Sequence, residues 1–190
     1  MRPPLLPQLF SRDVRRIHCV GVGGMGVAPL AIYLAQLGFT VTGEDDGLTT
    51  AMRALLERER VAIGGIPEDC DLVVYSSAIG RQHPAHLAAV HRGLPLVRRG
   101  ELLAEVVRGK KLVAVCGSHG KTTTTALLIT ALRSAHFPAG YILGGLFADD
   151  TPPARIGSNE WVVAEVDESD GTIERFAPEL TLTVNLDWDH

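Results

Sequence analysis

Short apolar runs alternate along the chain with longer segments in which apolar residues recur every three or four positions. The runs predict strands, and the segments of helical period predict helices. Strands are expected within residues 17–22, 39–42, 71–75, 94–97, 112–116, 161–166 and 180–184. Helices are expected within residues 28–37, 49–60, 84–92 and 101–108, and up to about residue 131 after the strand at 112–116. Strands that alternate with helices predict right-handed βαβ units on parallel sheets, so the fold class is α/β.

A polar segment, Arg108-Gly-Lys-Lys111, separates two such series of strands and helices. Beyond it the pattern begins again with an apolar strand, a glycine-rich loop and a helix. We therefore expect two α/β domains, one over residues 1–109 and a second that begins at residue 110 and continues to 190.

The composition excludes several classes of protein. With 190 residues, 46% of them hydrophobic, the chain can bury a core, and its net charge of −4 argues against binding nucleic acid by bulk charge. No apolar run reaches the ~20 residues of a membrane span, and the opening residues do not resemble a signal peptide. Three cysteines far apart (Cys19, Cys70 and Cys116) suggest buried thiols in a reducing compartment. We expect a cytoplasmic protein with no membrane span and no nucleic-acid partner.

The first glycine-rich loop, Gly21 to Gly26 (GVGGMG), lies between a predicted strand and a predicted helix. Its spacing matches G-x-G-x-x-G through Gly21, Gly23 and Gly26, and acidic residues follow ~20 positions later. Glycines let the backbone approach a phosphate, and a helix N-terminus attracts an anion. The loop predicts a diphosphate ligand, with a tight turn that binds nothing as the alternative. Its spacing alone does not distinguish NAD from a UDP-sugar.

The second loop, Cys116-Gly-Ser-His-Gly-Lys-Thr-Thr123, is more specific. Gly117 and Gly120 free backbone amides for phosphate oxygens, Lys121 adds a positive charge, and the Thr122 hydroxyl can bind Mg²⁺. Because Val115 replaces the first glycine of the usual eight-residue P-loop, the match is to a shorter G-x-x-G-K-T loop. The alternative is a chance Gly-Lys-Thr at a helix start. An NAD-dependent oxidoreductase built on the first loop would leave this loop unexplained.

The segment WVVAEVDESD, residues 161–170, is apolar at first and then abruptly acidic. Glu165 and Asp167 share one face of an extended strand, where a carboxylate beside the phosphate loop would hold a metal ion. The alternative is a solvated acidic turn. His190 follows two aspartates after the last predicted strand and, taken alone, is equally an ordinary residue. Cys116 lacks a Cys-His-acid arrangement and is interpreted as buried packing.

Five segments occur in the order found in Mur ligases, and the chain resembles that family from about Ile17 to His190. They are IHCVGVGGMGVAPLA, SSAI, GSHGKTTTT, AEVDESDGT and VNLDWDH. The departures are modest: Ser118 stands where the family usually has Thr, Val166 where it often has Ala, GEDD where GSD is usual, and Val27 where Met is common. The resemblance implies a Rossmann-like first domain and a second domain that is the beginning of a P-loop ATPase-type domain.

The resemblance also implies roles for individual residues. The diphosphate of a UDP-sugar would be held by Gly21, Gly23, Gly24 and Gly26, with Asp45, Ser76 and Ser77 on the uridine side. The phosphates of ATP would be held by Gly117, Ser118, His119, Gly120, Lys121, Thr122 and Thr123. Thr122, Glu165 and His190 would be magnesium ligands, His190 for a second ion, and the catalytic residues would be Lys121, Glu165 and His190.

The activity implied by the closest resemblance is a ligase of peptidoglycan biosynthesis that uses ATP and Mg²⁺. It would join L-alanine to the carboxylate of UDP-N-acetylmuramate through an acyl phosphate. Two alternatives remain open: a recycling ligase that joins the same sugar nucleotide to a tripeptide, and a UDP-sugar-binding fragment without turnover. Family members continue beyond the last motif found here, so we expect residues 1–190 alone to be inactive. The oligomeric state stays open.

Overall fold

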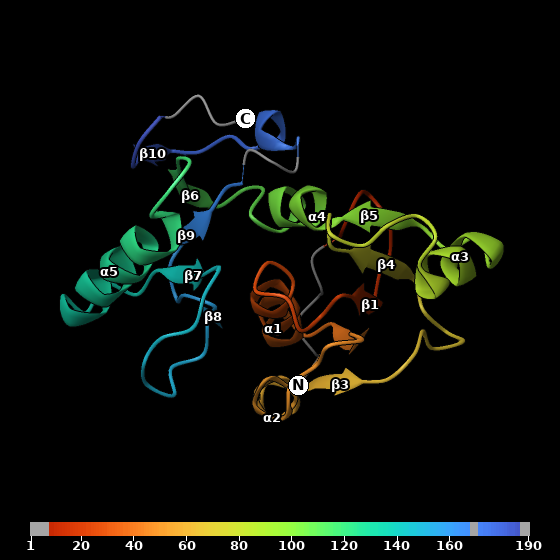
Figure 1. The fold of residues 1–190 in the computed structure, drawn as a ribbon. Coiled ribbons are helices and arrows are strands. Elements are labelled where there is room, and N and C mark those ends of the chain that lie inside the picture. Colours follow the sequence, from red (N-terminus) through yellow and green to blue (C-terminus); the bar gives the residue numbers. More distant parts are fainter. Residues whose placement is uncertain (1–7, 168–170, 187–190) are drawn as a thin grey trace, which may run out of the picture. The chain divides into compact units, whose positions relative to one another are not determined.

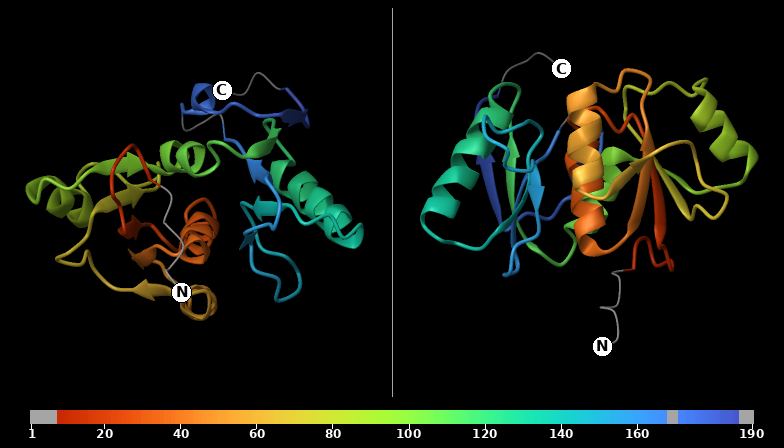
Figure 2. Two further views of the ribbon diagram at one scale, coloured as in Figure 1. Left: turned by 180° about the vertical axis from the view of Figure 1, so that it is seen from behind. Right: turned by 90° about the horizontal axis from the view of Figure 1, so that it is seen from below.

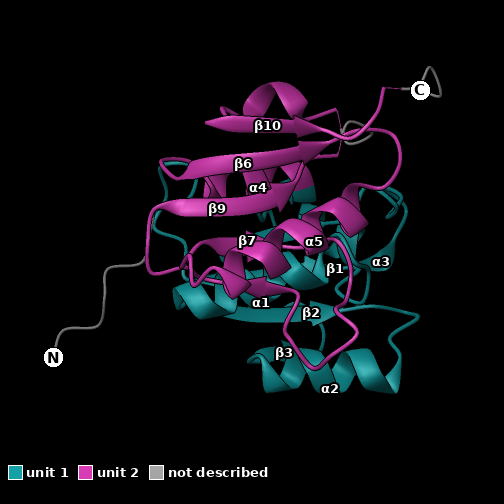
Figure 3. Cartoon of the chain, turned by 90° about the vertical axis from the view of Figure 1, so that its left-hand side faces the viewer, with its two compact units in different colours: residues 1–99 teal, residues 100–190 magenta. Residues whose placement is uncertain are grey.

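The structure is a computed structural model that describes residues 8–167 and 171–186. The chain divides into two compact units, residues 1–99 and 100–190, which are coloured separately in Figure 3. Each unit contains a five-stranded sheet with helices against it (Figure 1). The predicted α/β fold class with parallel strands is therefore confirmed.

The first unit has strand order β3-β2-β1-β4-β5, and all of its paired strands are parallel. The strands are β1 (Arg16–Val20), β2 (Thr40–Glu44), β3 (Val61–Ile63), β4 (Leu72–Tyr75) and β5 (Leu96–Arg98). The helices are α1 (Ala28–Leu37), α2 (Thr50–Arg58) and α3 (Pro84–His91). Helices α1 and α2 lie on one side of the sheet and α3 on the other (Figure 2), as right-handed connections on either side of β1 require.

The core of this unit explains why its helices form where they do. Seven of the ten residues of α1 are buried, and the helix ends at Gly38, whose φ of 100° is left-handed. On the other side of the sheet, Ala85 and Ala89 of α3 pack with Val20 and Val73 of the central strands. Both faces of β1 and β4 are thus covered, which fits the apolar sequence of β4 and the burial of every β1 residue after Arg16.

The second unit has strand order β10-β6-β9-β7-β8, in which only the β7–β8 pair is antiparallel. The strands are β6 (Lys111–Cys116), β7 (Gly140–Ile142), β8 (Ala154–Arg155), β9 (Trp161–Glu165) and β10 (Leu180–Thr183). The helices are α4 (Arg99–Val106), α5 (Lys121–Ser134) and the 3₁₀ helix η2 (Ile173–Arg175). Most of α4 belongs to this unit by its contacts, because the unit begins at Gly100. The sequence analysis placed this helix in the first domain, before a boundary near residue 109, and that domain boundary stays a prediction.

The structure bears on the expected burial of the cysteines and on membrane-spanning helices. Cys19 and Cys70 are buried, but Cys116 is partly exposed, so the expectation of a buried thiol is wrong there. Cys116 is the last residue of β6, at the end of the strand where the chain turns into the second glycine loop. In the described part of the chain, no helix combines the length and apolarity needed to span a membrane.

Candidate functional site

The first glycine loop is pinned to the carboxyl end of the neighbouring strand β2. The amides of Gly21 and Val22 both donate to the carbonyl of Glu44, at 2.9 and 3.1 Å. Gly21 has a φ of +79°, a conformation that favours glycine. A Cβ on Gly43, in β2, would lie 2.7 Å from the Cβ of Val22. The close contact between β2 and the loop therefore also requires glycine at position 43.

Asp45 holds the middle of this loop. Its carboxylate accepts hydrogen bonds from the amides of Gly23, at 3.0 Å, and Gly47, at 2.8 Å. Among the described residues, none accepts a hydrogen bond from the amides of Met25 and Gly26, which lie just before α1. These two donors are therefore the ones that the loop can offer to an anion.

The start of α1 differs from the starts of α2 and α3 in a way that suits an anion. Helix α2 is capped by the Thr49 hydroxyl and α3 by the His83 ring, each accepting a backbone amide. Helix α1 has no side-chain cap, and neither does α5, which follows the second loop. Both helices that follow a glycine loop thus leave the positive end of their dipole to a ligand.

Ser76 lies beside the first loop. A Cβ on Gly21 would be 3.3 Å from the Ser76 Cβ, and the Ser76 hydroxyl accepts the amide of Ala78 at 3.2 Å. Ser77 is exposed. The structure therefore brings Gly21, Gly23, Asp45 and Ser76 together, with Ser77 next along the chain.

A cavity of about 350 Å³ in this unit has a lining that sequence reasoning did not single out. It is lined by Glu44, Asp46, Ile66, His83, Pro84, Ala85, Ala88 and Arg92. The ring of His83 lies 3.4 Å from the Asp46 carboxylate, and Arg92 donates to the carbonyls of Ile66, Pro67 and Glu68. Asp45, Ser76 and Ser77 are not among its lining residues.

Burial shifts the pKa values of His18 and Glu44, which lie near each other in this unit. Burial lowers the pKa of His18 to about 4, with a smaller contribution from Arg92. Burial also raises the pKa of Glu44, and Asp46 adds to this increase while His83 opposes it. The Nε2 atom of His18 lies 3.7 Å from the Glu44 carboxylate, and Nδ1 is 2.8 Å from the Thr42 hydroxyl.

The second glycine loop has the geometry of a phosphate cradle. Gly117 and Gly120 have φ values of +133° and +78°, and within the described ranges no group accepts their amides. The Lys121 ammonium donates to the Gly117 carbonyl at 2.6 Å, so its charge lies directly over the loop. Backbone donors around a lysine are what bound phosphates require.

Asn185, which sequence reasoning missed, holds this loop from the end of β10. Its side-chain oxygen accepts the amide of His119 and its side-chain nitrogen donates to the carbonyl of His119, both at 3.0 Å. A Cβ on Gly117 would lie 2.9 Å from the Asn185 carbonyl oxygen. The motif VNLDWDH contained the residue, but only the parallel pairing of β10 with β6 brings it to the loop.

Thr122, the second residue of α5, lies beside Glu165, the last residue of β9. The Thr122 hydroxyl donates to Glu165 Oε2 at 3.0 Å, and Glu165 Oε1 accepts the amide of Gly144 at 2.8 Å. The described residues contain no group of three His, Cys, Asp or Glu that would hold a metal ion alone, and His190 lies outside them. A hydroxyl and a carboxylate nevertheless fit Mg²⁺, which takes few protein ligands and completes its shell with phosphate oxygens and water.

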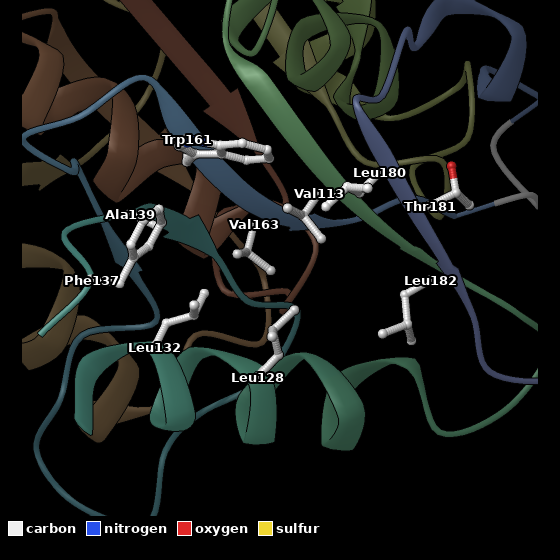
Figure 4. A pocket seen from close by; sticks show the side chains of 10 residues that line it. All are labelled: Val113, Leu128, Leu132, Phe137, Ala139, Trp161, Val163, Leu180, Thr181 and Leu182. Atoms are coloured by element: carbon white, nitrogen blue, oxygen red, sulfur yellow. The ribbon is translucent and has the colours of Figure 1, made fainter. Parts of the chain in front are cut away.

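A second cavity, of about 450 Å³, lies between α5 and the strands β6, β9 and β10 (Figure 4). Its lining is almost entirely apolar: Val113, Leu128, Leu132, Phe137, Ala139, Trp161, Val163, Leu180, Thr181 and Leu182. Since no charged side chain lines it, we assign it no part in binding phosphate.

Comparison with known proteins agrees with these loops. The sequence profile described as "Mur ligase family, catalytic domain" matches residues 16–111, about half of the chain. The chain belongs to the Mur ligase family. The family resemblance seen in the sequence is therefore confirmed.

Two curated relatives of this Mur ligase chain share the same name. The UDP-N-acetylmuramate–L-alanine ligase of Rhodopseudomonas palustris is 39% identical over 185 residues, which are 95% of this chain and 40% of the relative. The ligase of the same name from Azorhizobium caulinodans is 43% identical over 178 residues, 92% of this chain and 38% of the relative. The chain thus spans about two fifths of the length of these relatives.

Solved structures include two kinds of ligase with the same fold. The UDP-N-acetylmuramate-alanine ligase MurC of Thermotoga maritima matches with a TM-score of 0.84 and 28% identity, over 92% of this chain and 42% of that one. The UDP-N-acetylmuramate:L-alanyl-gamma-D-glutamyl-meso-diaminopimelate ligase (MPL) from Neisseria meningitides matches with a TM-score of 0.83 and 26% identity, over 94% of this chain and 62% of that one.

Proposed function

We propose that the protein containing this Mur ligase chain is an ATP-dependent ligase of peptidoglycan biosynthesis that joins L-alanine to the carboxylate of UDP-N-acetylmuramate. The observation that carries the proposal is the pair of glycine loops, each between a parallel strand and a helix without a side-chain cap. The second loop continues into Lys121 and Thr122, and the Thr122 hydroxyl donates a hydrogen bond to Glu165. The names of the curated relatives support the choice of substrates.

In the first unit, Gly21, Gly23, Gly24 and Gly26 would hold the diphosphate of the UDP-sugar. The amides of Met25 and Gly26 and the N-terminus of α1 supply the donors. Asp45 keeps the loop in shape through Gly23 and Gly47, so we assign it a supporting role on the uridine side. Ser76 and Ser77 would lie there as well.

In the second unit, residues 117–123 would hold the phosphates of ATP, with Lys121 as the mobile positive charge. Thr122 and Glu165 would be ligands of Mg²⁺, and His190 the ligand of a second ion. Bound Mg²⁺ would neutralise charge on the phosphates and orient them. Because Lys121 now donates to Gly117, it would move from that carbonyl to a phosphate oxygen when ATP binds.

The reaction then takes two displacement steps. A carboxylate oxygen of the muramoyl group attacks the γ-phosphorus of ATP, the bond to the β-phosphate bridging oxygen breaks, and ADP leaves. The amine of L-alanine attacks the resulting acyl phosphate, loses a proton, and the tetrahedral intermediate expels inorganic phosphate. Lys121 would stabilise charge on the γ-phosphoryl group as it moves.

The recycling ligase is the second candidate, because a solved structure of that kind matches this fold about as well as the alanine ligase does. We expect the full open reading frame that contains this chain to release ADP from ATP, Mg²⁺ and UDP-N-acetylmuramate when L-alanine is added. Release with the tripeptide L-alanyl-γ-D-glutamyl-meso-diaminopimelate instead would favour the recycling ligase. Binding of the sugar nucleotide without ADP release under either condition would leave a binding module.

A further inference from the structure

Two consecutive glycines, Gly144 and Gly145, follow β7 and lie against the Thr122–Glu165 pair. Strand β7 is parallel to β9, so the end of β7 is beside Glu165. The Gly144 amide donates to Glu165 Oε1 at 2.8 Å, while Oε2 of the same carboxylate accepts the Thr122 hydroxyl at 3.0 Å. One backbone donor and one side-chain donor therefore fix both oxygens of Glu165.

Neither glycine leaves room for a side chain. A Cβ on Gly144 would lie 2.7 Å from Glu165 Oε2 and 3.1 Å from its carboxyl carbon. A Cβ on Gly145 would lie 2.5 Å from the Cγ2 methyl of Thr122. A methyl group at either position would force a side chain of the pair to move.

The backbone conformation does not explain these glycines. Gly144 and Gly145 are absent from the glycines with positive φ, so a left-handed backbone is not the reason for glycine here. What alanine could not do is keep Thr122 and Glu165 where they are. The space required by these two side chains is thus the reason for glycine.

We propose that Gly144 and Gly145 are positioning residues that set the orientation of the Thr122 hydroxyl and the Glu165 carboxylate toward a nucleotide-bound metal ion. The inference rests on the proposed function, in which these two side chains are magnesium ligands. The atoms that a new methyl would touch are the ends of side chains, which can rotate without unfolding the sheet. Substitution should therefore weaken metal binding much more than it lowers stability.

The sharpest test pairs Gly145→Ala with Thr122→Ser, since serine lacks the methyl that clashes but keeps the hydroxyl. In the full open reading frame, binding of Mn²⁺ in the presence of a non-hydrolysable ATP analogue is measured by electron paramagnetic resonance. We expect Gly145→Ala to weaken Mn²⁺ binding at least tenfold relative to the wild type. The double variant, in which the clashing methyl is gone, should bind Mn²⁺ at least fivefold more tightly than Gly145→Ala alone. The matched control is Gly80→Ala, whose Cβ would meet nothing within 4 Å.

Thermal unfolding separates positioning from folding. The melting temperature of Gly145→Ala should stay within about 4 °C of the wild type. If Gly145→Ala does not fold, Gly144→Ala is measured in its place, with the same expected loss of Mn²⁺ binding.

Three results would overturn the proposal. A folded glycine variant could bind Mn²⁺ as tightly as the wild type, the double variant could bind it no more tightly than Gly145→Ala, or the wild type could bind no Mn²⁺. None of these measurements needs turnover. Absence of alanine-dependent ADP release would therefore refute the proposed ligase without touching this inference.

Discussion

Lys121 is the residue whose charge the proposed reaction needs most. Its ammonium lies 2.6 Å from the Gly117 carbonyl, at the place where phosphates would sit. We expect Lys121→Ala to lower alanine-dependent ADP release at least a hundredfold, because it removes a preorganised charge beside the moving phosphoryl group.

Binding of UDP-N-acetylmuramate by Lys121→Ala should stay within twofold of the wild type in a calorimetric titration, because the first unit holds the first glycine loop. Near-normal ADP release by this variant would show that Lys121 has been given the wrong role.

His18 predicts a pH dependence of stability. It is fully buried, and its pKa is lowered from 6.5 to about 4. Between pH 6.5 and 4 the unfolded chain binds a proton that the folded chain does not, so the free energy of unfolding falls as the pH falls. The full loss is about 3 kcal/mol.

Urea unfolding of wild type and His18→Gln at several pH values measures this loss. The carboxylates are common to both proteins, so the difference between their pH profiles isolates His18. The variant should lose less stability than the wild type over this window. Equal profiles would contradict the assignment.

At the scale of single residues, the sequence predicts which residues would contact phosphate but not which residues support them. Lys121, Thr122 and Glu165 stand in recognisable motifs, and the structure brings the last two within hydrogen-bond distance. Gly144 is 21 residues from Glu165, and Asn185 is 66 residues from His119. Only the pairing of distant strands creates such contacts, so spacing along the chain could not predict them.

Among the elements, β10 has a role beyond completing the sheet. It delivers Asn185 to the second loop, where two hydrogen bonds hold the backbone of His119. We expect Asn185→Ala to raise the Kd for ATP at least fivefold, since the loop loses both restraints, and Asn185→Asp to raise it further by adding negative charge near the phosphates. Fluorescent ATP-analogue titration measures both, and unchanged affinity in Asn185→Ala would remove β10 from the site.

The turn from β1 to α1 gives a second prediction at the level of elements. A Cβ on Gly23 would lie 3.0 Å from both the Asp45 carboxylate and the Leu48 side chain. Gly23→Val must displace the carboxylate that shapes the loop, so we expect affinity for UDP-N-acetylmuramate to fall at least tenfold, about 1.4 kcal/mol.

Gly64→Val is the control for this substitution, because a Cβ on Gly64 meets nothing within 4 Å. Calorimetric titration of both variants decides the matter. Equal affinities would place the sugar nucleotide away from this loop.

Three of the short strands, β3, β7 and β8, were not predicted from the sequence, whereas β5 lies at a predicted strand. β3 and β7 have three residues each and β8 has two, which is too few to show alternation. They form because longer neighbouring strands offer a free sheet edge: among the described residues, β3 pairs with β2 alone and β8 with β7 alone. The longer elements agree with expectation to within a few residues, as for α1, whose end at Gly38 was readable from the sequence.

At the scale of the whole molecule, the proposed ligase activates the carboxylate of UDP-N-acetylmuramate with ATP. The proposed reaction needs one glycine loop from each of the two units. A side chain from elsewhere holds each loop through hydrogen bonds: Asp45 holds the first and Asn185 the second. The chain spans about two fifths of its curated relatives, so the decisive test uses the full open reading frame.

The most direct measurement follows oxygen from substrate to product. UDP-N-acetylmuramate labelled with ¹⁸O in its carboxylate is incubated with ATP, Mg²⁺ and L-alanine, and the products are analysed by mass spectrometry. We expect UDP-N-acetylmuramoyl-L-alanine to form only when alanine is present, with one ¹⁸O transferred to each inorganic phosphate released, since the acyl phosphate passes that oxygen to phosphorus. Phosphate without label, or no alanine adduct, would contradict the account.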